Sequence, residues 1–231
     1  MTKLVQMLQK KEMSLIVSLP SNNYEVFQAA VEGGADSIKI HFNVDHRASG
    51  NHFLSVDHYK ELIGQMVNSF SGPLGAVVGD ALHKVTKEEV DRLAEAGFDF
   101  ISLYTKHAPG WLCSERRLNR MLAVDNNYTD QLIASFRSMP IEVLEASIIP
   151  GEEYGTSLSI HDLLNYRHLT ELAGKPVVVP SQRKIEVHDL AALQTAGVQG
   201  VMIGAIVTGT EAQSIYEATK KMRQELDRLA G

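Results

Sequence analysis

The sequence has a single cysteine, Cys113, among 231 residues. One thiol cannot form a disulfide within the chain, and low cysteine usage is typical of a reducing compartment. No apolar run approaches the roughly 18 residues of a membrane span, and residues 1–12 lack the apolar block of a signal peptide. The expectation is a cytoplasmic protein with no membrane partner.

Proline is scarce too, with 7 residues against 17 glycines. The 22 lysines and arginines are fewer than the 28 aspartates and glutamates, which gives a formal net charge of −6. This composition argues against low complexity, and the negative charge disfavours nucleic acid as a main partner. A small anionic ligand is not excluded, because its binding depends on the charges of a local pocket and not on the net charge of the whole chain. With 44% hydrophobic residues, the chain is long enough for one α/β domain, residues 1–231, with a substantial core.

A sequence pattern typical of a helix C-terminus occurs three times, around Gly34, Gly97 and Gly197. In each copy a helical pattern stops at the glycine, which suits the left-handed residue of a helix C-terminus. An apolar strand pattern starts about three residues later. Repeats of this kind build a parallel sheet, and ligands of such sheets and barrels bind at the C-terminal ends of the strands.

Alternating strand and helix patterns run along the whole chain and predict a single (βα)8 TIM barrel of the α/β class. A short amphipathic helix is expected before the first strand, within residues 1–12, and only a short helix has room within residues 109–119. The expected strands are 14–19, 37–42, 73–79, 98–104, 120–125, 141–148, 175–180 and 200–204. The expected helices are 24–31, 56–70, 87–96, 129–137, 160–172, 187–195 and 212–229.

Two of the expected strands carry charged residues on the face that alternation turns into the barrel. Lys39 and His41 alternate with apolar residues on the second strand, and Glu145 is flanked by Leu144 and Ala146 on the sixth. A buried charge needs a partner. One interpretation is a structural ion pair between Lys39 and Glu145. The other is an acid–base pair, since confinement makes a lysine usable as a base or as an imine-forming amine.

Further polar side chains are expected around the same pocket. His41 is expected to orient a substrate hydroxyl, and Ser18, Tyr104 and Asp125 lie at the ends of the first, fourth and fifth strands. The long polar segment 43–53 follows the second strand and is expected to act as a lid. Its candidate substrate contacts are Asn43, His46 and Arg47. The histidines and aspartate of this region match no specific metal-ligand spacing, so no metal and no cofactor is predicted.

The last two strands are the candidate anion site. Gly204 permits close approach of backbone amides at the exit of the eighth strand, next to Ala205. Ser181 and Arg183 follow the seventh strand. Because TIM barrels often bind phosphate at these two loops, we expect a phosphate site formed by these four residues.

Residues 197–206 resemble the final phosphate-binding strand of the ribulose-phosphate-binding barrel superfamily, and residues 75–101 resemble its middle unit. Members include N-acylmannosamine-6-phosphate epimerase, keto-deoxy-phosphogluconate aldolase and the keto-gulonate-phosphate decarboxylases. The family often has paired glycines where this chain has Ser181 and Gln182, and Lys39 lacks the decarboxylase Asp-x-Lys-x-x-Asp spacing. The resemblance implies a small phosphorylated metabolite as ligand and a Lys–Glu pair like that of the epimerase.

Three functions stay open on this sequence. The first is a sugar-phosphate isomerase or epimerase that uses Lys39 and Glu145. The second is a Schiff-base aldolase or other lyase, acting through Lys39 on a phosphorylated keto acid or sugar. The third is a barrel that binds a phosphorylated metabolite without catalysis. A homodimer is also left open.

Overall fold

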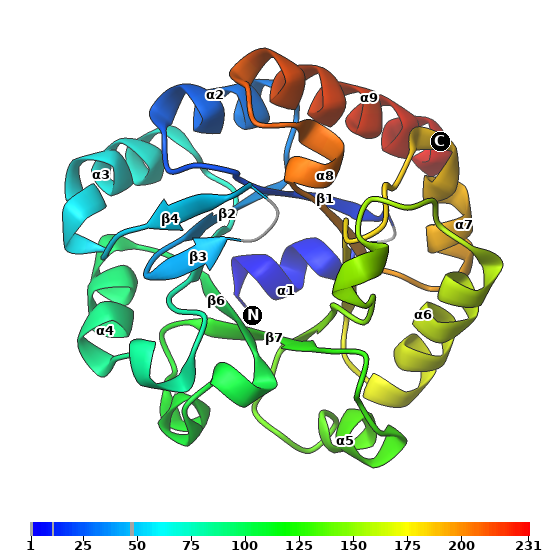
Figure 1. The fold of residues 1–231 in the computed structure, drawn as a ribbon, viewed down its shortest axis with the longest axis horizontal. Coiled ribbons are helices and arrows are strands. Elements are labelled where there is room, and N and C mark those ends of the chain that lie inside the picture. Colours follow the sequence, from blue (N-terminus) through cyan, green and yellow to red (C-terminus); the bar gives the residue numbers. More distant parts are fainter. Residues whose placement is uncertain (1, 11, 47–48) are drawn as a thin grey trace.

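A closed barrel of parallel strands forms the centre of the computed structural model, which describes residues 2–10, 12–46 and 49–231 (Figure 1). The strand order around the barrel is β1-β10-β9-β8-β7-β6-β5-β2, and β1 pairs with both β10 and β2. All eight expected strands are confirmed. They are β1 Ser14–Ser18, β2 Ser37–His41, β5 Leu74–Val77, β6 Phe100–Tyr104, β7 Asn119–Val124, β8 Val143–Ala146, β9 Val177–Pro180 and β10 Gly200–Ile203.

Helices surround the barrel, as the repeated helix-to-strand pattern predicts. Gly34, Gly97 and Gly197 have φ values of +93°, +97° and +83°, the left-handed conformation expected at helix ends. The helices are α1 Lys3–Leu8, α2 Tyr24–Glu32, α3 Lys60–Ser69, α4 Lys87–Ala96, α5 Asp130–Ser135, α6 Ile160–Ala173, α7 Leu190–Thr195, α8 Ala205–Thr208 and α9 Ala212–Ala230. Short 3-10 turns are η1 Asp57–Tyr59, η2 Leu82–Lys84, η3 Thr105–His107, η4 Gly110–Ser114, η5 Gly151–Glu153 and η6 Val187–Asp189.

The fourth unit departs from the pattern, because the segment between β6 and β7, described throughout, contains only the 3-10 turns η3 and η4. The buried Arg120 at the start of β7 holds this segment. Its guanidinium donates to the carbonyl oxygens of Leu112, at 3.0 Å, and of Glu115, and it pairs with the Glu142 carboxylate at 2.6 Å. The short connection between β6 and β7 is therefore held to the barrel by the Arg120 side chain and not by the packing of a helix.

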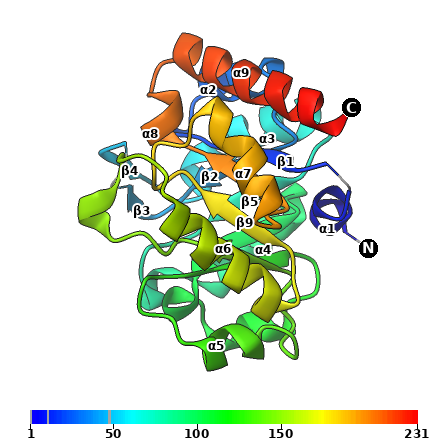
Figure 2. The same cartoon turned by 90° about the vertical axis from the view of Figure 1, so that its right-hand side faces the viewer.

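The N-terminal end of the barrel is closed by α1, as Figure 2 shows at the end opposite the β3–β4 hairpin. Leu4, Met7 and Leu8 of α1 are buried. They pack against an apolar layer inside the barrel formed by Ile16, Phe100, Met121, Val143, Val178 and Met202. Access to the barrel interior is thus from the C-terminal ends of the strands.

The polar segment after β2 is a β-hairpin and not an irregular loop. β3 Val44–His46 pairs in antiparallel register with β4 Asn51–Phe53. Val44 and Phe53 are paired and buried, so the hairpin has an apolar side that packs against the barrel. Arg47 lies outside the described residues.

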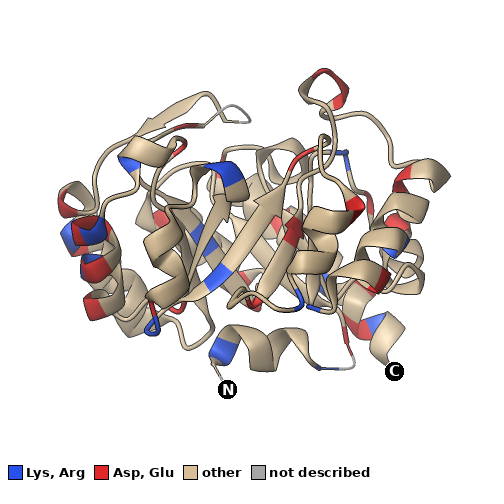
Figure 3. Cartoon of the chain, turned by 90° about the horizontal axis from the view of Figure 1, so that it is seen from below, with Lys and Arg blue, Asp and Glu red and all other residues tan. Residues whose placement is uncertain are grey.

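Charged residues lie mostly on the outer helices and loops in Figure 3, with few on the barrel strands. In the part of the chain that the structure describes, no helix is long and apolar enough to cross a membrane.

Candidate functional site

A cavity of about 520 Å³ opens at the C-terminal ends of the barrel strands. Its floor includes Lys39, Ser102, Glu145 and Met202, contributed by four different strands. The hairpin, the loops after β5, β6, β7 and β8, and the ends of β9 and β10 form its walls. The closed barrel thus brings together side chains that are far apart along the sequence.

Lys39 and Glu145 meet across the barrel, on strands that stand opposite each other in the strand order. The Lys39 Nζ lies 3.7 Å from Glu145 Oε2, and the side chains are only 7% and 8% exposed. Both side chains point into the barrel, as strand alternation predicts. At this distance there is no room for a substrate between the two groups.

Two serine hydroxyls hold the Glu145 carboxylate. Ser102 Oγ donates to Oε2 at 2.7 Å, and Ser147 Oγ donates to Oε1 at 2.9 Å. Tyr104 in turn hydrogen-bonds with Ser147, and burial raises the pKa of its phenol. The two serine hydrogen bonds orient the Glu145 carboxylate in the cavity floor.

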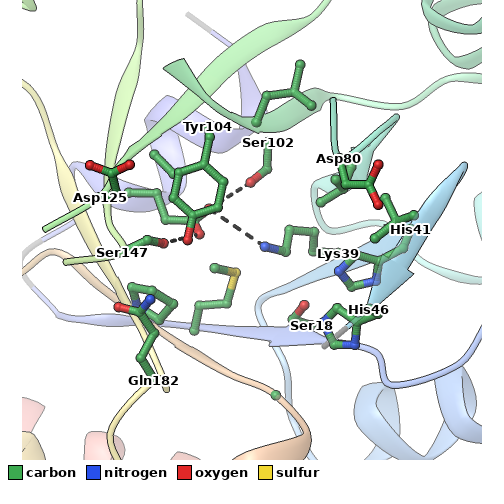
Figure 4. A pocket seen from close by; sticks show the side chains of 18 of the residues that line it. Ser18, Lys39, His41, His46, Asp80, Ser102, Tyr104, Asp125, Ser147 and Gln182 are labelled. Atoms are coloured by element: carbon green, nitrogen blue, oxygen red, sulfur yellow. Dashed lines mark hydrogen bonds and ion pairs between the residues drawn. The ribbon is translucent and has the colours of Figure 1, made fainter. Parts of the chain in front are cut away.

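Two histidines form the opposite wall, as Figure 4 shows for His41 and His46 on one side and Tyr104, Ser147 and Asp125 on the other. The ring centroids of His41 and His46 are 4.4 Å apart, and Phe53 lies 5.0 Å from His41. Burial, with His46 and Lys39 nearby, lowers the pKa of His41 well below its ordinary value. Burial and Lys39 lower the pKa of His46 to about 4. Both rings are therefore neutral at neutral pH and can accept or donate one hydrogen bond at each nitrogen.

The mouth of the cavity carries three carboxylates, Asp45, Asp80 and Asp125, each within ion-pair distance of a lysine. Lys106 donates to Asp125 Oδ2 at 2.7 Å, and this hydrogen bond lowers the pKa of Asp125. Lys84 lies 2.7 Å from Asp80, whose other oxygen accepts the N–H of Asp45 at 2.9 Å. The second contact ties the hairpin to the loop after β5.

The ends of β9 and β10 form the remaining wall. Gly204 N–H donates to Ser181 Oγ at 2.9 Å. Gln182 Nε2 donates to the Tyr154 hydroxyl at 2.6 Å, while its oxygen accepts the N–H of Ile149 at 3.0 Å. Tyr154 and Gln182 thus connect the loop after β8 to the end of β9.

Most of the residues selected from the sequence line this one cavity: Ser18, Lys39, His41, His46, Tyr104, Asp125, Glu145, Ser181, Gly204 and Ala205. Asn43 is not among the lining residues, and we leave it out of the proposed site. Arg183 is also outside the lining, because its guanidinium is 2.5 Å from Glu153 and 3.0 Å from Asp162. These ion pairs tie the segment after β9 to the loop after β8, and we leave Arg183 out of the proposed site.

Sequence reasoning missed Asp80 and Tyr154 as lining residues. Asp80 stands only three residues after β5, at the strand end where polar side chains face ligands. That position could have identified it, whereas nothing local marks Tyr154. Among the described residues, no group of three or more His, Cys, Asp or Glu side chains is arranged to hold a metal ion.

No protein-family model and no curated protein matches the chain. Solved structures share its fold. Tryptophan synthase from M. tuberculosis aligns with a TM-score of 0.72 at 16% identity, over 98% of this chain and 99% of that one. KGPDC from Streptococcus mutans gives 0.70 at 16% identity, over 95% and 99%. Thiamine phosphate pyrophosphorylase from Pyrococcus furiosus gives 0.68 at 16%, over 97% and 100%.

These solved structures share the fold of this chain over almost its whole length. The expected fold, a (βα)8 barrel with a short N-terminal helix, is confirmed. Likeness at this identity concerns the fold, and the chemistry has to be argued from the site.

Proposed function

We propose that this protein is a sugar-phosphate isomerase or epimerase whose acid–base unit is Lys39 and Glu145. The observation that carries the proposal is the buried ion pair, 3.7 Å long, at the floor of an open cavity of about 520 Å³. A pair needed only for stability is often replaceable by apolar residues without loss. A pair that faces a cavity lined with hydroxyls and imidazoles is placed to exchange protons with a ligand.

The ion pair suggests how the two groups divide the work. The Glu145 carboxylate takes a proton from the carbon beside a carbonyl group. The Lys39 ammonium donates to the carbonyl oxygen, where negative charge develops. Ser102 and Ser147 keep the carboxylate oriented through the hydrogen bonds of 2.7 and 2.9 Å. Lys39 and Glu145 would therefore act as one unit.

Substrate hydroxyls would be bound by the polar side chains of the walls. His41 and His46 lie on one wall and Tyr104 and Asp125 on the other. All four side chains line the cavity, together with Ser18 at the end of β1. Neutral imidazoles and hydroxyls bind sugar hydroxyls without adding charge, which suits a polyhydroxylated ligand.

The phosphate would lie at the ends of β9 and β10, against Ser181 and the backbone of Gly204 and Ala205. Ala205 begins α8, where the first N–H groups of a helix have no partner within it. A Cβ at Gly204 would meet Ser18 and Ser181 at ordinary contact distances, from 3.5 Å. Packing within the protein therefore does not require a glycine at position 204. Thiamine phosphate pyrophosphorylase shares this fold, and its name refers to a phosphate ester, which supports a phosphorylated substrate for this protein.

A lyase that forms an imine on Lys39 is the second candidate, because Lys39 Nζ faces the cavity beside a carboxylate. Borohydride reduction in the presence of a substrate carbonyl distinguishes the two. A covalent adduct on Lys39 indicates the lyase, and turnover that borohydride does not trap indicates the isomerase or epimerase.

The experiment that tests the proposal screens pentose and hexose monophosphates for protection against thermal unfolding, then for turnover. A ligand that binds the folded state raises the melting temperature by mass action. Lys39→Met and Glu145→Gln should each reduce turnover by about 100-fold or more, while Lys87→Met, an exposed lysine on α4, serves as the matched control. Near-normal turnover in Lys39→Met would leave the structural ion pair as the correct interpretation. Light scattering on the same samples tests whether the protein is a homodimer.

A further inference from the structure

One buried nitrogen in the wall of the cavity has no hydrogen-bond partner among the described residues. It is Nδ1 of His41, a residue at the end of β2 that is 3% exposed and lines the cavity. The other buried side-chain atoms that lack a partner in the described part of the chain belong to residues outside the cavity lining. Most buried polar atoms of folded proteins are paired, because leaving one unpaired is unfavourable. An unpaired atom in the wall of a ligand cavity is therefore a candidate contact for the ligand.

The second nitrogen of the His41 ring determines what Nδ1 can do. The ring hydrogen-bonds with the backbone of Leu19, and Nε2 makes this bond because Nδ1 is unpaired. The N–H of Leu19 already donates to the carbonyl oxygen of Lys39 at 2.9 Å, so the ring bonds to the Leu19 carbonyl. A carbonyl oxygen only accepts, which places the hydrogen on Nε2. Since burial lowers the pKa of His41 and keeps the ring neutral, Nδ1 is an acceptor only.

Most other imidazole, hydroxyl and phenol groups of the walls already have partners. They are His46 with Ser49 at 2.7 Å, Tyr104 with Ser147, Tyr154 with Gln182 at 2.6 Å, Ser102 and Ser147 with Glu145, and Ser181 with Gly204 at 2.9 Å. A ligand that hydrogen-bonds to one of these groups competes with an existing bond. A ligand that donates to Nδ1 of His41 supplies a bond that the protein itself does not make.

His41 also lies close to the proposed acid–base pair. His41 and Lys39 are two residues apart on β2, and both side chains line the cavity. Strand geometry places their Cα atoms about 6–7 Å apart. A sugar phosphate that lies against Lys39 and Glu145 therefore has hydroxyl groups within reach of the His41 ring.

The β3–β4 hairpin covers the His41 ring. The centroids of the His46 and Phe53 rings lie 4.4 Å and 5.0 Å from that of His41, and each strand of the hairpin contributes one of them. Figure 4 shows His41 and His46 on the same wall of the cavity. Because Nδ1 is buried in this arrangement, a ligand hydroxyl reaches it when the hairpin rings shift.

We infer that His41 Nδ1 accepts a hydrogen bond from one hydroxyl of the substrate, and that this bond selects the hydroxylated sugar over its deoxy analogue. A site with a buried polar group that only the ligand pairs rejects analogues that lack the pairing group. This inference rests on the proposed function and adds a specificity-determining residue to it. It applies to isomerase, epimerase and lyase chemistry alike, because the bond is made to a hydroxyl and does not depend on the later proton transfers.

The test combines a change in the ligand with a change in the protein. Calorimetry measures dissociation constants for the pentose or hexose monophosphate that raises the melting temperature most, and for its monodeoxy analogues. One deoxy analogue should bind the wild-type protein at least about 10-fold more weakly than its parent. His41→Phe should bind the two within about 3-fold of each other, since it has no acceptor to lose. The amide oxygen of His41→Asn should restore part of the difference, and the exposed-site control His161→Phe should leave it unchanged.

NMR of protein labelled with a nitrogen isotope observes the ring directly. The His41 Nδ1 resonance should be that of an unprotonated nitrogen in the free protein. It should move toward that of a hydrogen-bonded nitrogen with the parent ligand and not with the deoxy analogue. This comparison also decides the question if His41→Phe fails to fold.

The outcomes separate this inference from the proposed function. A protonated Nδ1 in the free protein, or an equal deoxy penalty in the wild-type and His41→Phe proteins, overturns the role of His41 and leaves the proposed function standing. If no pentose or hexose monophosphate raises the melting temperature, the proposed function fails, and the role of His41 fails with it.

Discussion

Removing one member of the buried pair should lower stability by a measurable amount. Lys39→Met deletes an ammonium 3.7 Å from Glu145 Oε2. Coulomb's law at that distance, with an effective dielectric constant of about 20, gives about 4.5 kcal/mol. The remaining carboxylate keeps its two serine hydroxyl donors, so we expect the lower end of the usual range of about 3–5 kcal/mol, about 3 kcal/mol. A domain of this kind has about 5–15 kcal/mol of stability and stays folded.

Urea unfolding at neutral pH, followed by circular dichroism, measures the effect in a double-mutant cycle. Glu145→Gln should also destabilise, because it leaves the Lys39 ammonium buried without its counter-ion. The double variant should be more stable than the sum of the two losses predicts, by about 1–3 kcal/mol, since it leaves no unpaired charge behind. A coupling energy within about 0.5 kcal/mol of zero would show that the two charges do not interact in solution and would contradict the ion pair.

Three further predictions concern the walls of the cavity. Gly204→Leu should weaken binding of inorganic phosphate at least about 10-fold by calorimetry with the fold intact, whereas Gly110→Leu, where a Cβ meets nothing within 4 Å, should not; equal dissociation constants would remove the phosphate site. Burial and Lys39 lower the pKa of His46 to about 4 in the folded protein, whereas an unfolded histidine has a pKa of about 6.5. Between these two pH values the unfolded chain binds a proton that the folded chain does not, so stability falls as the pH falls. His46→Asn should flatten this part of the urea profile and the exposed-site variant His161→Asn should not; identical profiles would contradict the burial of a neutral ring. Hydrogen exchange in the β3–β4 hairpin should slow when a turned-over monophosphate binds, and unchanged exchange would exclude a lid.

Local pattern was enough to predict the strands, the barrel and the inward charges. Alternation along a strand has a period of two, so Lys39 and Glu145 flanked by apolar neighbours had to point into the barrel. Glycine in the left-handed conformation marks a helix end whatever lies around it, which is why Gly97 and Gly197 could be placed from the sequence. The position of the cavity followed from the rule that ligands bind at the C-terminal ends of strands.

Partnerships between distant side chains had no local pattern to reveal them. Thr86 accepts the N–H of Glu89 at the start of α4, a local contact, whereas the Glu89 carboxylate accepts the N–H of Val56, 33 residues away. Nothing local in the sequence shows that the Arg183 guanidinium pairs with the carboxylates of Glu153 and Asp162. Such contacts depend on how neighbouring loops pack.

The chemistry of the candidate site depended on the same kind of information. That Lys39 and Glu145 face the barrel interior could be predicted from the sequence, because strand alternation is a local property. Only the tertiary structure decided that they touch at 3.7 Å above a filled barrel. That distance is set by the closure of eight strands and by the packing of Phe100 against Gly75, which involve residues far apart along the chain.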